Sequence, residues 1–238
     1  ATYYLLDALF QHAGTGESFR ARWKPSEERT PLDAEGRLVD EAAARAALAR
    51  FGDEPQDGKV VKYERKKVEE PPPLPFSLSA LQVLAGKRYG YEPQQVLDTA
   101  QKLYEEKLTT YPRSDAEYLP KSQHKDAPKI LSNLAGLSDS PLAAWAGEAD
   151  ASRKSRAWND EKITAHHAII PTTVPANPAR LSEMEQRIYE LIARAYIAQF
   201  HPNYVYDRTK VELSYHGETF TASGRTERAA GWRAMYRT

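Results

Sequence analysis

The sequence predicts an α+β protein in which a β-rich body is interrupted by a mainly helical insert. Apolar and charged residues alternate near both ends of the 238-residue chain, whereas the middle follows the helical period. Two proline-rich segments, 71–75 (PPPLP) and 169–179 (IIPTTVPANPA), lie where the period changes. Consecutive prolines cannot lie inside a sheet, so both segments should be crossings between domains. We expect a discontinuous β-rich domain at 1–75 and 172–238, and a helical domain at 76–171.

Turn and capping signals predict the N-terminal elements. Residues 2–11 and 17–23 flank the turn AGTG with alternating side chains, which indicates a hairpin. Asp40 and Gly52 bracket an alanine-rich segment and predict a short helix. Residues 58–70 alternate again and predict a strand.

The insert should begin with two helices. The first is expected to end at Gly90, and the second to start at Pro93, because proline is favoured at the first helical position. The apolar side chains of the second helix should face the core. They are Val96, Leu97, Ala100, Leu103 and Tyr104.

Local signals also predict the C-terminal elements. Ser182 and Glu185 form a capping-box pattern for a helix that runs to about Phe200. The segment YVYDRTKVELSYHGETFTASG predicts a final hairpin that turns at His216-Gly217.

Composition limits the classes of function. Lys plus Arg and Asp plus Glu both number 33, so the sequence lacks the broad basic field expected of a duplex-DNA-binding protein. This balance leaves a carbohydrate or peptide enzyme open. The absence of cysteine excludes disulfides and thiolate metal sites. No apolar run approaches the length of a membrane helix, which predicts no membrane partner and fits a cytoplasmic location. Because the sequence starts without Met, in strand-like residues, we expect a piece of a longer chain.

The stretch KLTTYPRSDAEYLP, residues 107–120, places Tyr111, Arg113 and Asp115 close together. Pro112 stops a helix and favours an extended backbone at Tyr111. A phenol becomes a nucleophile when its attack is assisted, and a guanidinium stabilises charge that develops on phosphoryl oxygens. Asp115 is placed to hold Arg113 or to steer a proton. An ordinary surface loop has the same spacing, so spacing alone leaves both interpretations open.

The segment TAHHAIIP contributes His166 and His167. Adjacent side chains on an extended chain point to opposite sides, so we expect one to face a site while the other packs or is solvated. Paired histidine ligands usually lie four residues apart on a helix, and no acidic pair is near, which argues against a metal. A single histidine suits a phosphate donor or a proton shuttle.

Together these segments resemble the type IA DNA topoisomerases, and most of all their topoisomerase III branch. The resemblance rests on LTTYPRSD and AHHAIIPT, on the preceding run LPFSLSALQ to QKLYEEK, and on the flanks GESFRARW, DAEGRLVD, RIYELIARAYIAQFHPNYVYDRTKVEL and AAGWRAMY. It covers essentially the whole chain. It implies an enzyme that cuts one DNA strand, leaves the 5′ phosphate on tyrosine, passes a strand and reseals the break.

The resemblance also implies roles for individual residues. Tyr111 is similar to the nucleophile, Arg113 to the arginine that steadies the tyrosine and the scissile phosphate, and His166 to the histidine beside that phosphate. Four residues match positions that support or contact the single strand: Gln101, Glu105, Thr110 and Asp115. Gln101 and Glu105 share a helix face, although a solvated face has the same spacing.

For the fold, the resemblance implies a toroidal enzyme in which the β-rich part is the arch (domain II) and the insert is the tyrosine-bearing domain (domain III). The family's metal-binding Toprim domain carries an Asp-x-Asp cluster, and this sequence has no Asp-x-Asp. Mg²⁺ would therefore be a cofactor of the full-length enzyme, with ligands outside this chain, which should be inactive by itself. The implied partners are single-stranded DNA and the remaining domains of a monomeric, bacterial, nucleoid-associated protein.

Two alternatives stay open. A tyrosine-nucleophile relaxase would space its metal-binding histidines around one hydrophobic residue, unlike His166 and His167, and a recombinase would place its tyrosine near the C-terminus. A non-catalytic single-stranded DNA-binding module differs from a topoisomerase in one observation, namely whether Tyr111 is needed for a covalent DNA adduct.

Overall fold

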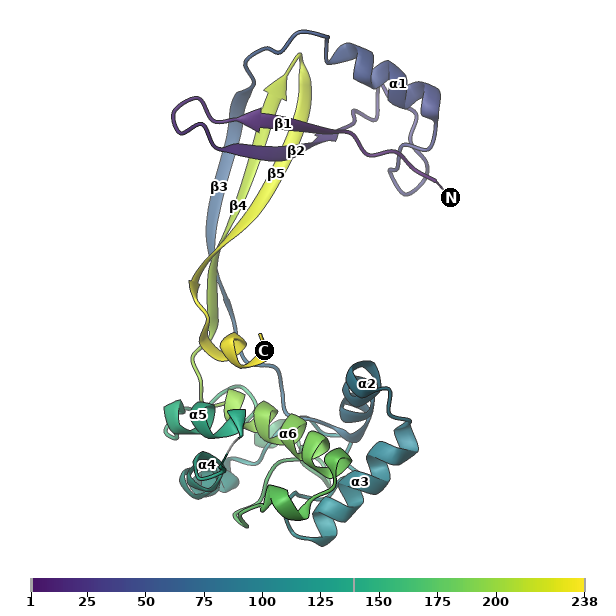
Figure 1. Ribbon diagram of the computed structural model, residues 1–238. Coiled ribbons are helices and arrows are strands. Elements are labelled where there is room, and N and C mark those ends of the chain that lie inside the picture. The colour runs from purple at the N-terminus through teal and green to yellow at the C-terminus, as the bar shows by residue number, and fades with distance from the viewer. Residues whose placement is uncertain (1, 139, 238) are drawn as a thin grey trace. The chain divides into compact units, whose positions relative to one another are not determined.

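The computed structural model describes residues 2–138 and 140–237, which form two units (Figure 1). The first unit comprises Ala1–Val68 and Val205–Arg228, and the second comprises Glu69–Tyr204 and Ala229–Thr238. The first is built on a sheet and the second on helices, so the predicted α+β class is confirmed.

The first unit is built on a five-stranded sheet with the strand order β1-β2-β5-β4-β3. Its strands are β1 (Asp7–Gln11), β2 (Ser18–Lys24), β3 (Lys59–Glu70), β4 (Tyr204–Tyr215) and β5 (Glu218–Ala229). β2 runs antiparallel to both β1 and β5, with Trp23 opposite Phe220. Strands from both ends of the chain therefore join in one sheet. His216 and Gly217 both have positive φ, as a two-residue hairpin turn requires.

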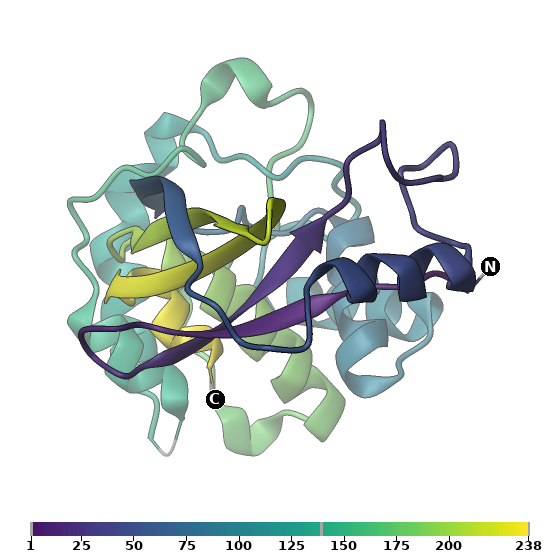
Figure 2. The ribbon, with the colours of Figure 1, turned by 90° about the horizontal axis from the view of Figure 1, so that it is seen from above.

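Helix α1 (Glu41–Arg50) packs against this sheet (Figure 2). It begins at the predicted N-cap, where an oxygen of Asp40 accepts a hydrogen bond from the amide of Ala42 at 3.0 Å. The inward side chains of the strands and of α1 form one apolar cluster, whose buried members are Ala21, Trp23, Leu38, Ala44, Ala47, Leu213 and Phe220. The core of the unit therefore lies between α1 and the sheet.

A buried carboxylate links three strands of the first unit. Asp207 on β4 accepts hydrogen bonds from Arg65 on β3 and Arg228 on β5, each at 2.8 Å, and its side chain is 2% exposed. Burial by itself would raise the pKa of Asp207. The hydrogen bonds from Arg228 and Arg65 outweigh that effect and hold the pKa below its usual range.

Acid is therefore expected to weaken the first unit through Asp207. A lowered folded-state pKa contributes stability above the unfolded pKa, near 4, and that stability is lost as the pH falls through the folded value. In urea unfolding, Asp207→Asn should be less stable than the wild type near neutral pH and should lose less stability on acidification. The exposed Asp57→Asn serves as control. An identical acid dependence in wild type and Asp207→Asn would contradict the prediction.

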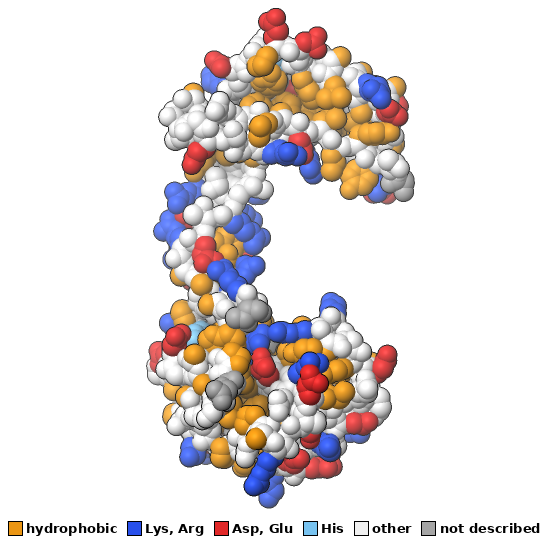
Figure 3. Space-filling model, viewed as in Figure 1, with side chains coloured by type: hydrophobic (Ala, Val, Ile, Leu, Met, Phe, Trp, Pro, Cys, Tyr) orange, Lys and Arg blue, Asp and Glu red, His pale blue; other side chains and the backbone are white. Residues whose placement is uncertain are grey.

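The second unit holds the other helices. Its α-helices are α2 (Leu78–Tyr89), α3 (Pro93–Glu105), α4 (Ala127–Ala135), α5 (Pro141–Glu148) and α6 (Glu183–Ala198). Short 3-10 helices are η1 (Lys121–Asp126), η2 (Asp160–Lys162), η3 (Pro178–Arg180) and η4 (Gly231–Tyr236). Basic and acidic side chains are interspersed on the face of this unit shown in Figure 3. None of the described helices has the length and apolar character needed to span a bilayer.

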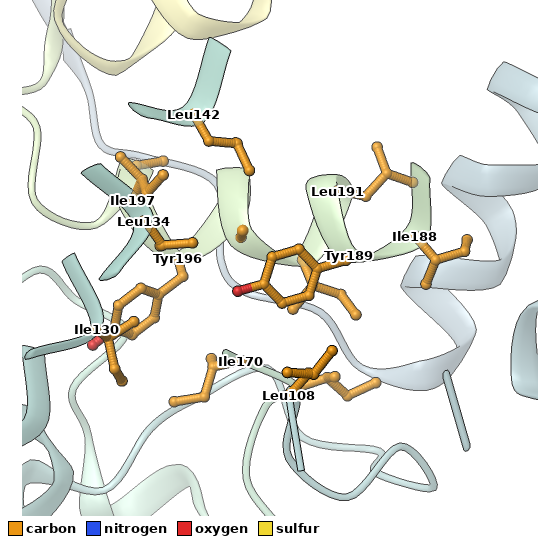
Figure 4. Packing of buried hydrophobic residues seen from close by; sticks show 14 of the residues in the cluster. Leu108, Ile130, Leu134, Leu142, Ile170, Ile188, Tyr189, Leu191, Tyr196 and Ile197 are labelled. Atoms are coloured by element: carbon orange, nitrogen blue, oxygen red, sulfur yellow. The ribbon is translucent and has the colours of Figure 1, made fainter. Parts of the chain in front are cut away.

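Helix α6 forms the centre of the second unit, and most of its residues are buried. Figure 4 shows Tyr189 and Tyr196 of α6 among apolar side chains of neighbouring elements, including Ile130 and Ile170. Burial raises the pKa of Tyr189 to about 12. Tyr189 and Tyr196 therefore belong to the apolar core of the unit.

The local helix signals are confirmed. Gly90 caps α2 in a left-handed conformation, and Pro93 is the first residue of α3. Ser182 and Glu185 form the predicted capping box, in which each side chain accepts a hydrogen bond from the other residue's backbone amide. Capping depends on neighbours in sequence, which is why sequence patterns can locate it.

The expected domain boundaries differ from the observed grouping. Three segments that the sequence places with the strands group with the helical unit, namely 69–75, 172–204 and 229–237. The physical reason is the burial of α6 on several faces, which demands helices α2, α3 and α5 as neighbours. A capping box marks where a helix begins but carries no information about what covers it.

Gly231 occupies a position in the second unit that only glycine fits. Its φ is +52°, and an added Cβ would lie 2.3 Å from the carbonyl oxygen of Asn203 and 2.4 Å from that of Pro202. Gly231→Ala should lower the free energy of unfolding by roughly 1–3 kcal/mol, measured by urea titration. Gly147→Ala on α5 is the control, because its Cβ would meet nothing within 4 Å. Equal stability of the two variants would contradict the prediction.

Candidate active site

Helix α3 leads into the tyrosine loop, residues 108–116, through a turn that glycine usually occupies. Lys107 adopts a left-handed φ of 63°. Its amide donates to the carbonyl of Tyr104 and the amide of Leu108 donates to that of Leu103, both at 2.9 Å. These two bonds define a Schellman motif. A non-glycine residue in this conformation costs about 1–2 kcal/mol, so the surrounding structure must hold the turn.

Two hydroxyl residues anchor the tyrosine loop on either side of Tyr111. The amide of Thr110 donates to the carbonyl of Ile170 at 2.9 Å, and the amide of Ile170 donates to the Thr110 hydroxyl at 3.0 Å. The Ser114 hydroxyl donates to the carbonyl of His167 at 2.7 Å. Only three residues lie between the two anchors. The loop is therefore fastened to 167–170 immediately before and after the segment that carries the phenol.

Tyr111 lies between two aromatic neighbours and is 39% exposed. Its ring stacks on His166, with centroids 5.3 Å apart and an interplanar angle of 26°. Tyr104 meets it nearly at right angles, with centroids 5.6 Å apart. The rings of Tyr111 and His166 border an open pocket of about 370 Å³, which Ala165 and His167 also line. The expectation that Tyr104 faces the core is wrong, since its side chain is 40% exposed.

The two adjacent histidines have different surroundings. His166 is exposed and stacks on Tyr111. The Nδ1 atom of His167 lies 2.8 Å from the carbonyl oxygen of Ala168. Its Nε2 atom lies 3.1 Å from the side-chain amide nitrogen of Gln123. A carbonyl only accepts, so Nδ1 carries the proton and Nε2 accepts from Gln123. His167 therefore fastens the histidine segment to η1, which leaves His166 beside the phenol.

Arg113 and Asp115 are both exposed, and in the described part of the chain no ion pair joins them. The idea that Asp115 holds Arg113 therefore has no support in the structure, and the guanidinium remains available to an external anion. On α3, the side-chain amide of Gln101 donates a hydrogen bond to a carboxylate oxygen of Glu105 at 3.1 Å. These two residues lie one helical turn apart. Tyr104, next to Glu105, is the α3 residue whose ring contacts that of Tyr111.

Sequence reasoning missed three residues that support the site: Tyr104, Ser114 and Gln123. Ser114 had a local signal, because its hydroxyl also accepts from the amide of Ala116 two residues later, a common serine turn. Gln123 lies far from His167 in sequence, so no local pattern marks the pair. Tyr104 fits the apolar period of α3, which is why it was assigned to the core.

The arrangement suits nucleophilic attack on an electrophile with anionic oxygens. An exposed phenol lies on an anchored loop, an imidazole stacks on it, and two residues later follows a guanidinium that has no ion-pair partner among the described residues. Among the described residues there is no group of three or more His, Asp or Glu side chains that could hold a metal ion. These residues themselves offer a nucleophile, Tyr111, and a cationic group, Arg113, that can bind anionic oxygens.

Comparison with known proteins identifies the family of this chain. Residues 1–238 match the family model described as DNA topoisomerase. The protein named DNA topoisomerase 3 of Vibrio cholerae is 43% identical over 237 residues, which cover 98% of this chain and 36% of that protein. The one from Salmonella typhimurium is 40% identical over 221 residues, covering 92% of this chain and 33% of that protein. The chain thus spans about a third of the length of these relatives.

A solved structure shares the fold. Full-length topoisomerase I from Thermotoga maritima superposes with a TM-score of 0.65 at 18% identity, covering all of this chain and 36% of that one. At this identity the likeness concerns the fold alone, and membership rests on the family model and the bacterial relatives. The family that the sequence motifs predict is confirmed, and this chain belongs to the DNA topoisomerase family.

Proposed function

We propose that this chain carries the nucleophile half of a type IA strand-cutting site. Tyr111 attacks a phosphodiester of single-stranded DNA. The phenol gives up its proton and its oxygen bonds to phosphorus as the bond from phosphorus to O3′ breaks, and the 3′ oxygen takes up a proton and leaves as a hydroxyl. A 5′-phosphotyrosine holds the cut end while another strand passes, and attack by the 3′ hydroxyl restores the backbone and frees the phenol. This allows relaxation or decatenation.

The observation that carries the proposal is the exposed Tyr111 ring on a loop anchored at both sides. Anchoring at Thr110 and Ser114 limits the positions of the phenol before DNA arrives, which reduces the entropy lost on reaching an attack geometry. Arg113 has no ion-pair partner among the described residues, so it can bind the phosphoryl oxygens and stabilise charge that grows on them. His166 stacks on the phenol. We assign it the contact with the phosphate next to the break.

The remaining assignments follow from the same proposal. Four residues support or contact the single strand: Gln101, Glu105, Thr110 and Asp115. The first unit corresponds to the family's arch and the second to its tyrosine-bearing domain. A formal net charge of zero suits a protein that binds the DNA strand through few phosphate contacts and releases it in each cycle. Further domains of the same polypeptide complete the site, and the full-length protein works as a monomer on nucleoid DNA in the bacterial cytoplasm.

The Mg²⁺ ion that the family resemblance implies does not fit the described residues of this chain. The described part has no group of three His, Asp or Glu side chains that could bind it. We therefore derive no step through a metal, and we propose that its ligands belong to another part of the full-length enzyme.

The test is to trap a covalent adduct of the full-length protein with a 3′-labelled single-stranded oligonucleotide and to map the modified peptide. We expect the DNA 5′ phosphate on Tyr111, no adduct with Tyr111→Phe, and an adduct with the control Tyr118→Phe in the same stretch. Tyr118 is suited because its hydroxyl accepts a hydrogen bond from Lys162 at 3.2 Å. An adduct on another residue would sink the proposal. Tight single-strand binding without any adduct would indicate a non-catalytic binding module.

A further inference from the structure

Tyr104 is an exposed aromatic residue whose ring contacts the nucleophile instead of the core. It lies one residue before the end of α3 and is 40% exposed. Its ring centroid is 5.6 Å from that of Tyr111, at an interplanar angle of 80°. This separation and angle match the edge-to-face geometry that aromatic pairs prefer. The contact is therefore an attractive one that orients both rings.

The two neighbours of Tyr111 constrain its ring in different ways. Stacking on His166, at an interplanar angle of 26°, favours one orientation of the ring plane. The perpendicular contact with Tyr104 opposes rotation of the ring out of its place. A tyrosine ring is positioned by two side-chain torsions, and an exposed side chain on a loop populates several rotamers unless neighbours select one. Together the contacts leave the phenol oxygen one favoured position.

Tyr104 is itself held in place by the turn that ends α3. Its carbonyl accepts the amide of Lys107, the residue with left-handed φ, so the same turn that starts the tyrosine loop holds the backbone of Tyr104. Within the described residues, the Tyr104 hydroxyl makes no hydrogen bond. The ring and not the hydroxyl therefore carries the interaction with Tyr111.

We infer that Tyr104 is a positioning residue, whose ring restricts Tyr111 to the rotamer from which the phenol attacks DNA. The inference rests on the proposed function of Tyr111 as nucleophile. It assigns Tyr104 no contact with the reacting phosphate. Loss of the ring frees Tyr111 to leave the attack rotamer, so the cleavage rate falls while binding of DNA through other groups is retained.

The test uses full-length Tyr104→Leu and Tyr104→Phe in single-turnover cleavage of a saturating single-stranded oligonucleotide, with affinity measured separately by anisotropy. Leucine keeps the helix and removes the ring, whereas phenylalanine keeps the ring. One aromatic contact corresponds to about a 2- to 10-fold effect, so Tyr104→Leu should cleave about that much more slowly at unchanged Kd. Tyr104→Phe should behave as wild type. Tyr63→Leu, 61% exposed in the other unit, is the control for losing a surface tyrosine.

Three results would overturn the inference. The first is a wild-type cleavage rate in Tyr104→Leu. The second is an equal loss of cleavage rate and DNA affinity in Tyr104→Leu, which would make Tyr104 a stacking platform for a base. The third is a defect of Tyr104→Phe as large as that of Tyr104→Leu. If the wild type forms no adduct on Tyr111, the proposed function falls separately. The positioning role is then decided by ¹⁹F NMR of 3-fluorotyrosine placed at 111. Its resonance should change in Tyr104→Leu but not in Tyr104→Phe, and an unchanged spectrum in both would refute positioning.

Discussion

The 238-residue chain produced by itself is expected to leave negatively supercoiled plasmid unrelaxed, with or without magnesium, although it contains Tyr111. The chain covers 36% of its Vibrio cholerae relative, and its described residues include no group that could hold a metal ion. Tyr111 borders an open pocket lined by four residues of this chain, which provide little surface to hold a phosphate in line with the phenol. Loss of such positioning raises the activation free energy of the cleavage step by on the order of 7–11 kcal/mol.

The measurement is a plasmid relaxation assay that compares the chain, its Tyr111→Phe variant and the full-length protein at equal concentrations. Circular dichroism and anisotropy with a single-stranded oligonucleotide show whether the isolated chain is folded and retains weak, salt-dependent binding. We expect topoisomers to change only with the full-length protein. Relaxation by the chain alone that disappears with Tyr111→Phe would contradict the division of labour between this chain and the rest of the enzyme.

Arg113→Ala in the full-length enzyme is expected to slow strand cleavage far more than it weakens DNA binding. The guanidinium is exposed and, among the described residues, has no ion-pair partner, so its charge is available to the substrate. Its main effect should be on charge that grows on the phosphoryl oxygens during attack. Losing one such contact costs about 2–4 kcal/mol, or roughly 30- to 1000-fold in rate. The cleavage rate of Arg113→Lys should lie between those of the wild type and Arg113→Ala, because lysine keeps the charge but lacks the planar guanidinium that binds two oxygens at once.

Single-turnover cleavage and equilibrium binding of the same oligonucleotide separate the two effects. Arg153→Ala is the matched control, since Arg153 is an exposed arginine of the same unit and lies 3.9 Å from Asp150. It should leave both quantities near wild type. If Arg113→Ala reduced cleavage and affinity by equal factors, Arg113 would bind phosphate uniformly and would not act on the transition state.

Sequence patterns located the elements whose signals are local. The N-cap at Asp40, the start of α3 at Pro93 and the left-handed cap at Gly90 each depend on residues within one turn of the chain. The hairpin turn at His216-Gly217 depends on two residues that adopt positive φ. Local backbone preferences are written in neighbouring residues, so these predictions did not need the fold.

The candidate site divides in the same way. The motif around Tyr111 singled out the phenol and Arg113, and the family resemblance singled out His166. The structure places the rings of Tyr111 and His166 in contact. The support of this pair escaped prediction, because Ser114 meets His167 and Gln123 meets the His167 ring only after distant segments have folded together. The assignment of Tyr104 to the core failed because a 3.6-residue period does not tell whether the last apolar side chain of a helix meets the core or a loop.

The sequence by itself determined the α+β class, the participation of both chain ends in strands, the family and the identity of the candidate nucleophile. Only the tertiary structure decided that α6 belongs with the helical unit, that the His167 ring contacts Gln123, and that Tyr104 flanks Tyr111. The physical reason is range. Caps, turns and strand alternation arise from interactions between residues close in sequence, whereas burial and ring contacts arise from packing between segments that the chain brings together only when it folds.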